Sequence, residues 1–180
     1  MRKLQFLAII IALLGGCAAK QNKTNQDLTS LNEIYHLERD YAVVDDEATT
    51  AIQEFLKANS IDVTRHDDYI LLVNYGARKF TMTPRLLKGQ LSRLVVRRHY
   101  SIREDFHRST EIVNFVFNLN QRTNFGQFSV TGDGESLMIR SSITFVDNLD
   151  IKEVRKFLTF FNDLIYATIE AIPETHKYLY

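Results

Sequence analysis

The sequence contains a single cysteine, Cys17, and no tryptophan. One cysteine cannot form a disulfide within the chain, so packing alone has to hold the fold together. Beyond its first residues the sequence also lacks any apolar stretch near the length of about 18 residues that a membrane-spanning helix requires, so we expect no second membrane segment. Hydrophobic residues make up 45% and charged residues 24% of the chain, which is typical of a globular domain.

The usual signatures of catalysis and metal binding are absent as well. The sequence has no phosphate-binding glycine loop, no Gly-x-Ser-x-Gly motif and no His-Glu-x-x-His motif. Its histidines lie too far apart to form a ligand pair on one helical face; they are His36, His66, His99, His107 and His176. His66-Asp67-Asp68 and Gly132-Asp133-Gly134 are typical of turns, and the second lacks the ligand spacing of a calcium loop. We therefore expect no enzyme activity, no metal and no cofactor; an envelope enzyme with a site assembled only in three dimensions stays open as an alternative.

Acidic residues are missing between Tyr69 and Arg103, although the whole chain is neutral, with 22 basic and 22 acidic residues. The preceding stretch, 27–68, carries 11 acidic and three basic residues. The basic residues of 69–103 are Arg78, Lys79, Arg85, Lys88, Arg93, Arg97, Arg98 and Arg103. Such segregation of charge can steer a charged partner to one part of the surface.

The beginning of the chain has the pattern of a secretory signal. Met1-Arg2-Lys3 is a basic head, and a short apolar run follows it to Leu14. The run ends in Leu14-Gly15-Gly16-Cys17, which resembles the lipobox of bacterial lipoproteins. The resemblance implies cleavage before Cys17 and a diacylglycerol, with fatty acids such as palmitate, on its sulfur. An ordinary signal peptide or an uncleaved anchor, with an incidental cysteine, is the alternative.

The residue after the lipobox cysteine influences the membrane to which a bacterial lipoprotein is sorted. Ala18 stands there in place of an aspartate. By resemblance to enterobacterial lipoproteins, this residue permits sorting to the outer membrane. We therefore expect a membrane-anchored protein that faces the periplasm.

The chain divides into four expected segments. They are the signal peptide (1–16), the lipidated N-terminus and tether (17–44), a folded domain (45–172) and a C-terminal tail (173–180). In chain order, the domain is expected to begin with a helix from Asp45 or Asp46 to Asn59, followed by strands at 61–65, 69–75 and 91–100. A second helix is expected from the capping box Ser101-Ile102-Arg103-Glu104 to about Gln121. A hairpin around Gly132-Asp133-Gly134 and a last helix from Asp150 to Pro173 follow. Residues 79–83 are a candidate for a further strand that Pro84 stops. The fold class is therefore α+β, an antiparallel sheet of about five strands with helices, in the order α-β-β-β-α-β-β-α.

This order of elements, with Asn118-Leu119-Asn120 closing a helix before Asn124-Phe125-Gly126-Gln127-Phe128, resembles the YbjN family. Its members are described as putative sensory transduction regulators, and they share the fold of type III secretion chaperones. The resemblance covers about 45–172 and is strongest from 112 to 169. It implies a secretion-chaperone-like fold and a regulatory or protein-binding domain, and it carries no established chemistry. The lipobox and the basic strand depart from the usual cytoplasmic member, which argues against a cytoplasmic role.

The long strand at 91–100 carries the first set of candidate binding residues. Arg93 and Arg97 share one face of this strand, whereas Arg98 interrupts the apolar opposite face. We favour a half-buried strand whose charged face meets water and protects an edge against aggregation. The alternative is a platform formed by these arginines for an anionic partner, such as lipid headgroups, lipopolysaccharide phosphates or an acidic protein segment.

The last helix carries the second set of candidate binding residues, because its aromatic residues spread around more than one face. Most of them are expected to line the core. Secretion chaperones of this fold are commonly dimers that hold partly extended partner segments. The resemblance therefore implies that Phe157 and Phe160 contact a second copy or a client protein.

The sequence thus predicts a lipid-anchored, non-enzymatic envelope protein whose domain binds another protein. Its expected partners are the membrane, through the lipid on Cys17, an unidentified envelope protein and a second copy of the chain. Nucleic acid is not expected for an exported protein. The alternative is a headgroup- or glycan-binding module that uses the basic region 69–103.

Overall fold

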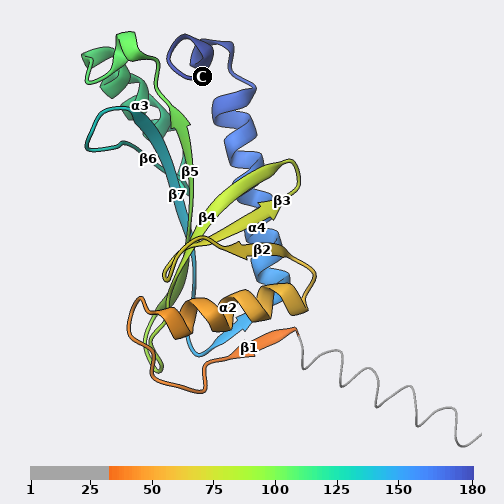
Figure 1. Ribbon diagram of the computed structural model, residues 1–180. Helices are drawn as coiled ribbons and strands as arrows, with labels where there is room; N and C mark the ends of the chain where they lie inside the picture. The colour runs from red at the N-terminus through yellow and green to blue at the C-terminus, as the bar shows by residue number, and fades with distance from the viewer. Residues whose placement is uncertain (1–32) are drawn as a thin grey trace, which may run out of the picture.

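The computed structural model of the protein describes residues 33–180. The signal-like segment, the lipobox and Cys17 lie outside the described residues. Figure 1 shows an elongated molecule in which two long strands and helix α4 run side by side, with further helices towards both ends.

A six-stranded antiparallel sheet forms the centre of the fold, in the order β2-β3-β4-β5-β7-β6. Its strands are β2 (Asp62–Arg65), β3 (Leu71–Tyr75), β4 (Arg78–Arg85), β5 (Ser92–Ser101), β6 (Gln127–Val130) and β7 (Ser136–Phe145). β5 and β7 pair along their whole length, from Ser92 opposite Phe145 to Ser101 opposite Ser136. The α+β fold class is therefore confirmed, with one strand more in the sheet than the sequence indicates.

Three helices cover one face of this sheet: α2 (Asp46–Ala58), α3 (Thr110–Arg122) and α4 (Ile151–Ile165). Each begins where the side chain of the preceding residue, Asp45, Ser109 or Asp150, accepts a hydrogen bond from a free N–H of the first turn. Phe161 of α4 meets Phe80 of β4 edge to face, with 5.2 Å between ring centroids. Both rings lie in a continuous core to which all three helices contribute.

No helix covers the other face of the sheet among residues 33–180. Successive residues of a strand point to opposite faces. On β5, Leu94 and Val96 are fully buried beneath the helices, whereas Arg93 is exposed and Arg97 is half-buried on the uncovered side. The alternation predicted for 91–100 is confirmed, and it leaves a polar, basic sheet face. The expectation that this strand protects an edge of the sheet is wrong, because β5 lies between β4 and β7.

The packed part of the chain begins before residue 45. Ile34–His36 form strand β1, which pairs antiparallel with β8 (Asn148–Asp150). Leu37 and Tyr41 are buried in the core. Residues 34–41 therefore belong to the domain, although the sequence placed them in the tether. Local pattern could not reveal this, because His36 and its partner Asn148 are 112 positions apart in the sequence.

The C-terminal residues are also packed against the domain. α4 continues into a π-helix, η2 (Tyr166–Glu170), and a 3-10 helix follows, η3 (Pro173–Lys177). Tyr178 stacks on Phe115 of α3 at 4.7 Å between ring centroids, and Leu179 forms a β-bridge with Ile102. Residues 173–180 therefore close the end of the fold and are no free tail.

Two local predictions fail for reasons of strand pairing. Ser101-Ile102-Arg103-Glu104 begins no helix, because Ser101 is paired with β7 and the chain makes a single 3-10 turn, η1 (Glu104–Phe106), before α3. Pro84 lies within β4 and does not end it. The pairing of β4 with β3 stops at Met82, which lies opposite Leu71, the first residue of β3. At Pro84 β4 therefore has a neighbour on one side only, where a missing N–H is tolerated. The candidate segment 79–83 is thus a full strand, which accounts for the sixth one.

Within residues 33–180 no helix is both long and apolar enough to cross a membrane.

Candidate binding surfaces

The outer edge of β7 is paired along part of its length. β6 pairs with residues 137–140 of β7. Next to this pairing, the hydroxyl of Ser141 donates a hydrogen bond to the carbonyl oxygen of Phe125 at 2.8 Å. Residues 142–145 then have no strand beside them on this side within the described part of the chain. Unpaired strand edges can pair with another extended segment through their backbone groups.

An aromatic groove of about 420 Å³ lies beside this edge, lined by residues 141–144 of β7 and by Phe125, Lys156, Phe157 and Phe160. Phe125 is 71% and Phe160 42% exposed, and their rings meet edge to face with 5.3 Å between centroids. Phe157 is half-buried and stacks on Phe161 of the core. We call the unpaired residues 142–145 of β7 and this aromatic groove together the edge groove.

The structure brings Phe157 and Phe160, predicted as contact residues, into this edge groove. It adds Phe125, which the sequence reasoning did not single out. Phe125 stands in the loop between α3 and β6, where no periodic pattern reports the direction of a side chain. The hydrogen bond between this loop and Ser141 and the contact of the Phe125 ring with Phe160 place this ring beside α4.

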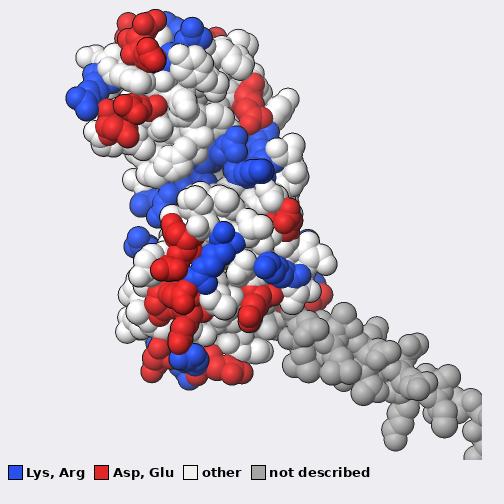
Figure 2. Space-filling view, in the orientation of Figure 1, with Lys and Arg blue, Asp and Glu red and all other residues white. Residues whose placement is uncertain are grey.

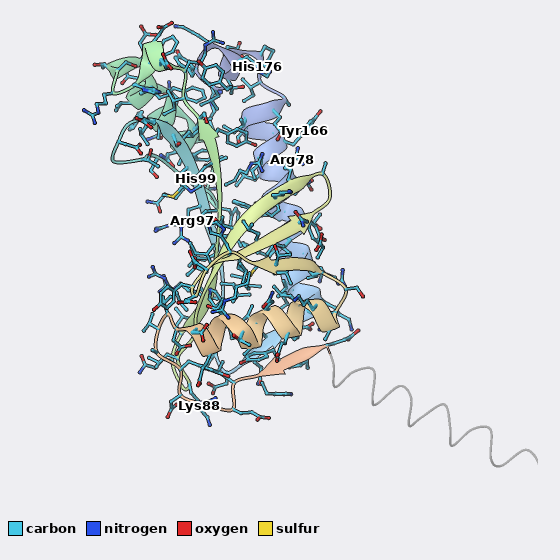
Figure 3. All side chains as sticks on the ribbon, in the orientation of Figure 1. Arg78, Lys88, Arg97, His99, Tyr166 and His176 are labelled. Atoms are coloured by element: carbon cyan, nitrogen blue, oxygen red, sulfur yellow. The ribbon has the colours of Figure 1, made fainter. Side chains whose placement is uncertain are left out.

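The three arginines predicted as an anionic platform do not share one face. Arg93 and Arg97 lie on the uncovered face of the sheet, whereas Arg98 lies on the helix-covered face opposite Ile139. Figure 3 shows Arg97 and His99 on one side of β5 and Arg78 on the other side, towards α4. The platform of Arg93, Arg97 and Arg98 is therefore corrected: Arg98 is not part of it.

Arg98 instead joins a polar cluster between the sheet and η2. Its Nη1 donates a hydrogen bond to the carbonyl oxygen of Lys79 at 2.8 Å, and its guanidinium lies over the ring of Tyr100. Arg78 forms an ion pair with Glu170 of η2, and Nη1 of Arg78 donates to the side chain of Asn162 at 2.6 Å. The cluster ties β4 and β5 to the end of α4, which is a structural role.

The same cluster shifts two pKa values. The hydrogen bond from Arg78 is the largest cause that lowers the pKa of Glu170, and the Tyr100 hydroxyl, 3.1 Å from the carboxylate, also lowers it. Burial first, and then the charge of Glu170, raise the pKa of Tyr100 to about 12. Tyr100 therefore stays a neutral donor to a carboxylate that stays ionised.

We expect Glu170→Gln to remove part of the pH dependence of stability. Because the folded pKa of Glu170 is lowered, its ion pair stabilises the fold above the unfolded pKa of the carboxyl, and this contribution is lost as pH falls through the folded value. The Glu170 side chain is 36% exposed, so solvent screening limits the loss to about 1 kcal/mol at neutral pH. Urea unfolding at neutral and acidic pH checks this: wild type and variant converge in acid, and an equal difference at both pH values would contradict the assignment.

Among residues 33–180 no group of three His, Asp or Glu side chains is placed to hold a metal ion.

No protein-family model and no curated protein sequence matches the chain. Among solved structures, the chain matches the crystal structure of YbjN, a putative transcription regulator from E. coli, with a TM-score of 0.54. The fold resembles that of YbjN. The match covers 76% of this chain and 98% of the YbjN chain, at 11% sequence identity. This likeness confirms the fold implied by the family resemblance, and at this identity it shows the fold alone.

Proposed function

We propose that the protein is a lipid-anchored envelope protein whose YbjN-like domain catalyses no reaction and binds an extended segment of a protein partner. The observation that carries the binding proposal is the edge groove, where an unpaired strand edge and exposed aromatic rings coincide. The anchor is proposed from the lipobox-like Leu14-Gly15-Gly16-Cys17. It would hold the domain at the outer membrane, facing the periplasm.

An extended segment can use both parts of the edge groove at once. Its backbone would pair with residues 142–145 of β7 and so extend the sheet by one strand. Every second side chain of such a segment points to the same side. An apolar side chain at these positions would contact Phe125, Phe157 and Phe160. The segment proposed is therefore short and apolar at alternate positions.

A partner segment fits the edge groove better than a second copy of the chain does. The free edge is four residues long, and stable interfaces between folded domains bury about 1,600 Å². A short segment needs only the edge and the groove. The description of YbjN as a putative regulator also supports a regulatory or binding role.

We expect a photo-crosslinking phenylalanine analogue at Phe125 or at Phe160 to capture the same partner segment in cells. Because both rings line one groove, the two positions should crosslink to one stretch of about four to six partner residues. Mass spectrometry of the crosslinked peptides checks this. The matched control is Phe117, which is 60% exposed on α3 and lies outside the groove.

The affinity for that segment should fall by at least about tenfold in Phe160→Ser, because buried aromatic anchors carry most of the binding energy of an interface. Phe117→Ser should leave it unchanged. Raising the salt concentration should have little effect, since the proposed contacts are backbone hydrogen bonds and apolar contacts, with no ion pair among them. Capture at Phe117 of the same residues, or capture at Phe160 of a second copy of this chain, would contradict the proposed occupant.

A further inference from the structure

Four arginines from three neighbouring strands gather on the uncovered face of the sheet. Arg85 of β4 lies directly opposite Arg93 of β5, and Arg97 of β5 lies directly opposite Arg140 of β7. We call this set the arginine face. Figure 2 shows basic side chains in a band across the middle of the molecule, and Figure 3, in the same orientation, labels Arg97 at the left of this band and Arg78, from the other side of β5, at the right. The sequence could not group these residues, because 55 positions separate Arg85 from Arg140.

A row of small and hydroxyl-bearing residues separates the two arginine pairs. Thr83 of β4, Val95 of β5 and Ser142 of β7 are register partners in this row. Nη1 of Arg97 donates a hydrogen bond to the hydroxyl of Thr83 at 2.9 Å, so this guanidinium leans over the row. Thr83 and Val95 are buried although they lie on the uncovered face. The pairs are four residues apart along β5, which corresponds to about 13 Å.

In the part of the chain that the structure describes, no acidic side chain compensates the charges of the arginine face. Within residues 33–180 none of the four arginines forms an ion pair. Two of them donate hydrogen bonds to neutral groups: Arg97 to the hydroxyl of Thr83, and Arg140 to the side-chain oxygen of Gln127 at 2.6 Å. Like charges directly opposite each other on a sheet are destabilising. Burial first, and then the charges of Arg85 and Arg140, lower the pKa of Arg97, which agrees with this crowding.

Phosphate is the anion that suits this arrangement. Guanidinium groups bind phosphate oxygens through two parallel hydrogen bonds, and hydroxyls such as those of Thr83 and Ser142 can donate further ones. The arginine face is a broad, open part of a sheet. At one edge of it, Arg140 and Ser142 border a shallow hollow of about 310 Å³. A surface of this kind suits an array of phosphates better than one enclosed small molecule.

We infer that the arginine face binds the phosphate headgroups of an anionic lipid surface. Leu91 and Val146 support this source of phosphate, because both are exposed apolar residues and they flank the paired ends of β5 and β7 beside Arg93. Surfaces that bind membranes combine basic residues with exposed apolar ones. The strand positions of the face carry no Phe or Tyr on which nucleic acid bases could stack. The inference does not rest on the proposed anchor or on the edge groove, because none of the four arginines lines the groove, although Ser142 borders both surfaces.

The test measures the binding of residues 17–180 to vesicles at low salt. The protein carries Cys17→Ser, so that no lipid chain contributes to binding. We expect the protein to sediment with vesicles that contain phosphatidylglycerol and not with pure phosphatidylcholine vesicles. Arg85→Gln, Arg93→Gln, Arg97→Gln and Arg140→Gln together should lower the partition coefficient by about tenfold or more, since each basic residue near an anionic surface contributes several-fold. The double variant Arg85→Gln/Arg93→Gln should lower it by a smaller factor. Both of its residues are exposed, so this variant keeps the test valid if the quadruple variant fails to fold.

The matched control removes the same charge from helices on the covered side. It combines Lys57→Gln, Arg122→Gln, Lys152→Gln and Lys177→Gln, all at exposed positions. This control should keep nearly full binding. Equal losses in the two quadruple variants would overturn the inference, because net charge alone would then explain binding. Tighter binding to duplex DNA, to polyglutamate or to free glycerol phosphate than to the vesicles, or no vesicle binding at all, would overturn it as well.

Discussion

Cys17→Ser is expected to abolish lipid attachment and processing together. If the sequence Leu14-Gly15-Gly16-Cys17 functions as a lipobox, the sulfur of Cys17 is the atom that carries the diacylglycerol. Serine has no sulfur, so the variant should incorporate no labelled palmitate and should keep the length of the precursor on a gel. Ala18→Ser is the matched control, and it should be labelled and shortened like the wild type. A Cys17→Ser protein that is still cleaved and still membrane-bound would contradict the proposed anchor.

The anchor can be tested apart from the signal. When the chain with Cys17→Ser is exported behind an ordinary cleavable signal peptide, we expect most of it in the soluble periplasmic fraction. Each buried methylene of an acyl chain contributes about 0.8 kcal/mol, so two or more chains dominate membrane retention. Any remaining membrane-bound protein would be held by the arginine face, and salt screens such charge interactions. This fraction should therefore decrease as the salt concentration is raised.

Phe161→Ala and Phe160→Ala should differ greatly in stability although the residues are neighbours on α4. Phe161 is fully buried and contacts Phe80 of the sheet. Its truncation removes a ring from the core and leaves a cavity, which costs about 3–5 kcal/mol. Phe160 contacts the ring of Phe125 and borders the edge groove. Its truncation should cost no more than about 1 kcal/mol.

Urea denaturation measures this difference directly. The midpoint should fall strongly for Phe161→Ala and little for Phe160→Ala, and the slope of the free energy of unfolding against urea should stay near the wild-type value in both. Similar losses for the two variants would mean that Phe160 is part of the core. The proposal that its ring serves a partner would then lose its basis.

Local sequence pattern predicted the parts of the fold that depend on neighbours in the chain. The helix after Asp45 and the last helix after Asp150 begin where a carboxylate caps the first turn, as expected. The alternation at 91–100 correctly separated Leu94 and Val96 from Arg93. Patterns of this kind are set by the periods of helices and strands, so the sequence displays them directly.

The sequence-based predictions were wrong where residues distant in the sequence decide the local structure. Ser101 has the pattern of a helix cap, but its pairing with Ser136 makes it the end of a strand. Ile34–His36 form a strand because β8 lies beside them. Pro84 remains within β4 because the pairing of β4 with β3 stops at Met82. In each case backbone hydrogen bonds to a remote segment outweigh the local preference, since buried N–H and C=O groups need partners wherever these lie in the sequence.

The candidate binding surfaces also divide into properties that local sequence pattern shows and neighbours that only the pairing of distant strands decides. By itself, the sequence determined the fold class, the lipobox-like segment, the basic character of 69–103 and the surplus of aromatic residues on the last helix, because composition and periodicity express these properties. The alternation along 91–100 already separated Arg98 from Arg93 and Arg97, but only the tertiary structure added Arg85 and Arg140 to the arginine face. It alone placed Phe125 against Phe160, beside a strand edge that β6 leaves unpaired. Register between strands decides which side chains become neighbours, and register depends on pairing across the whole chain.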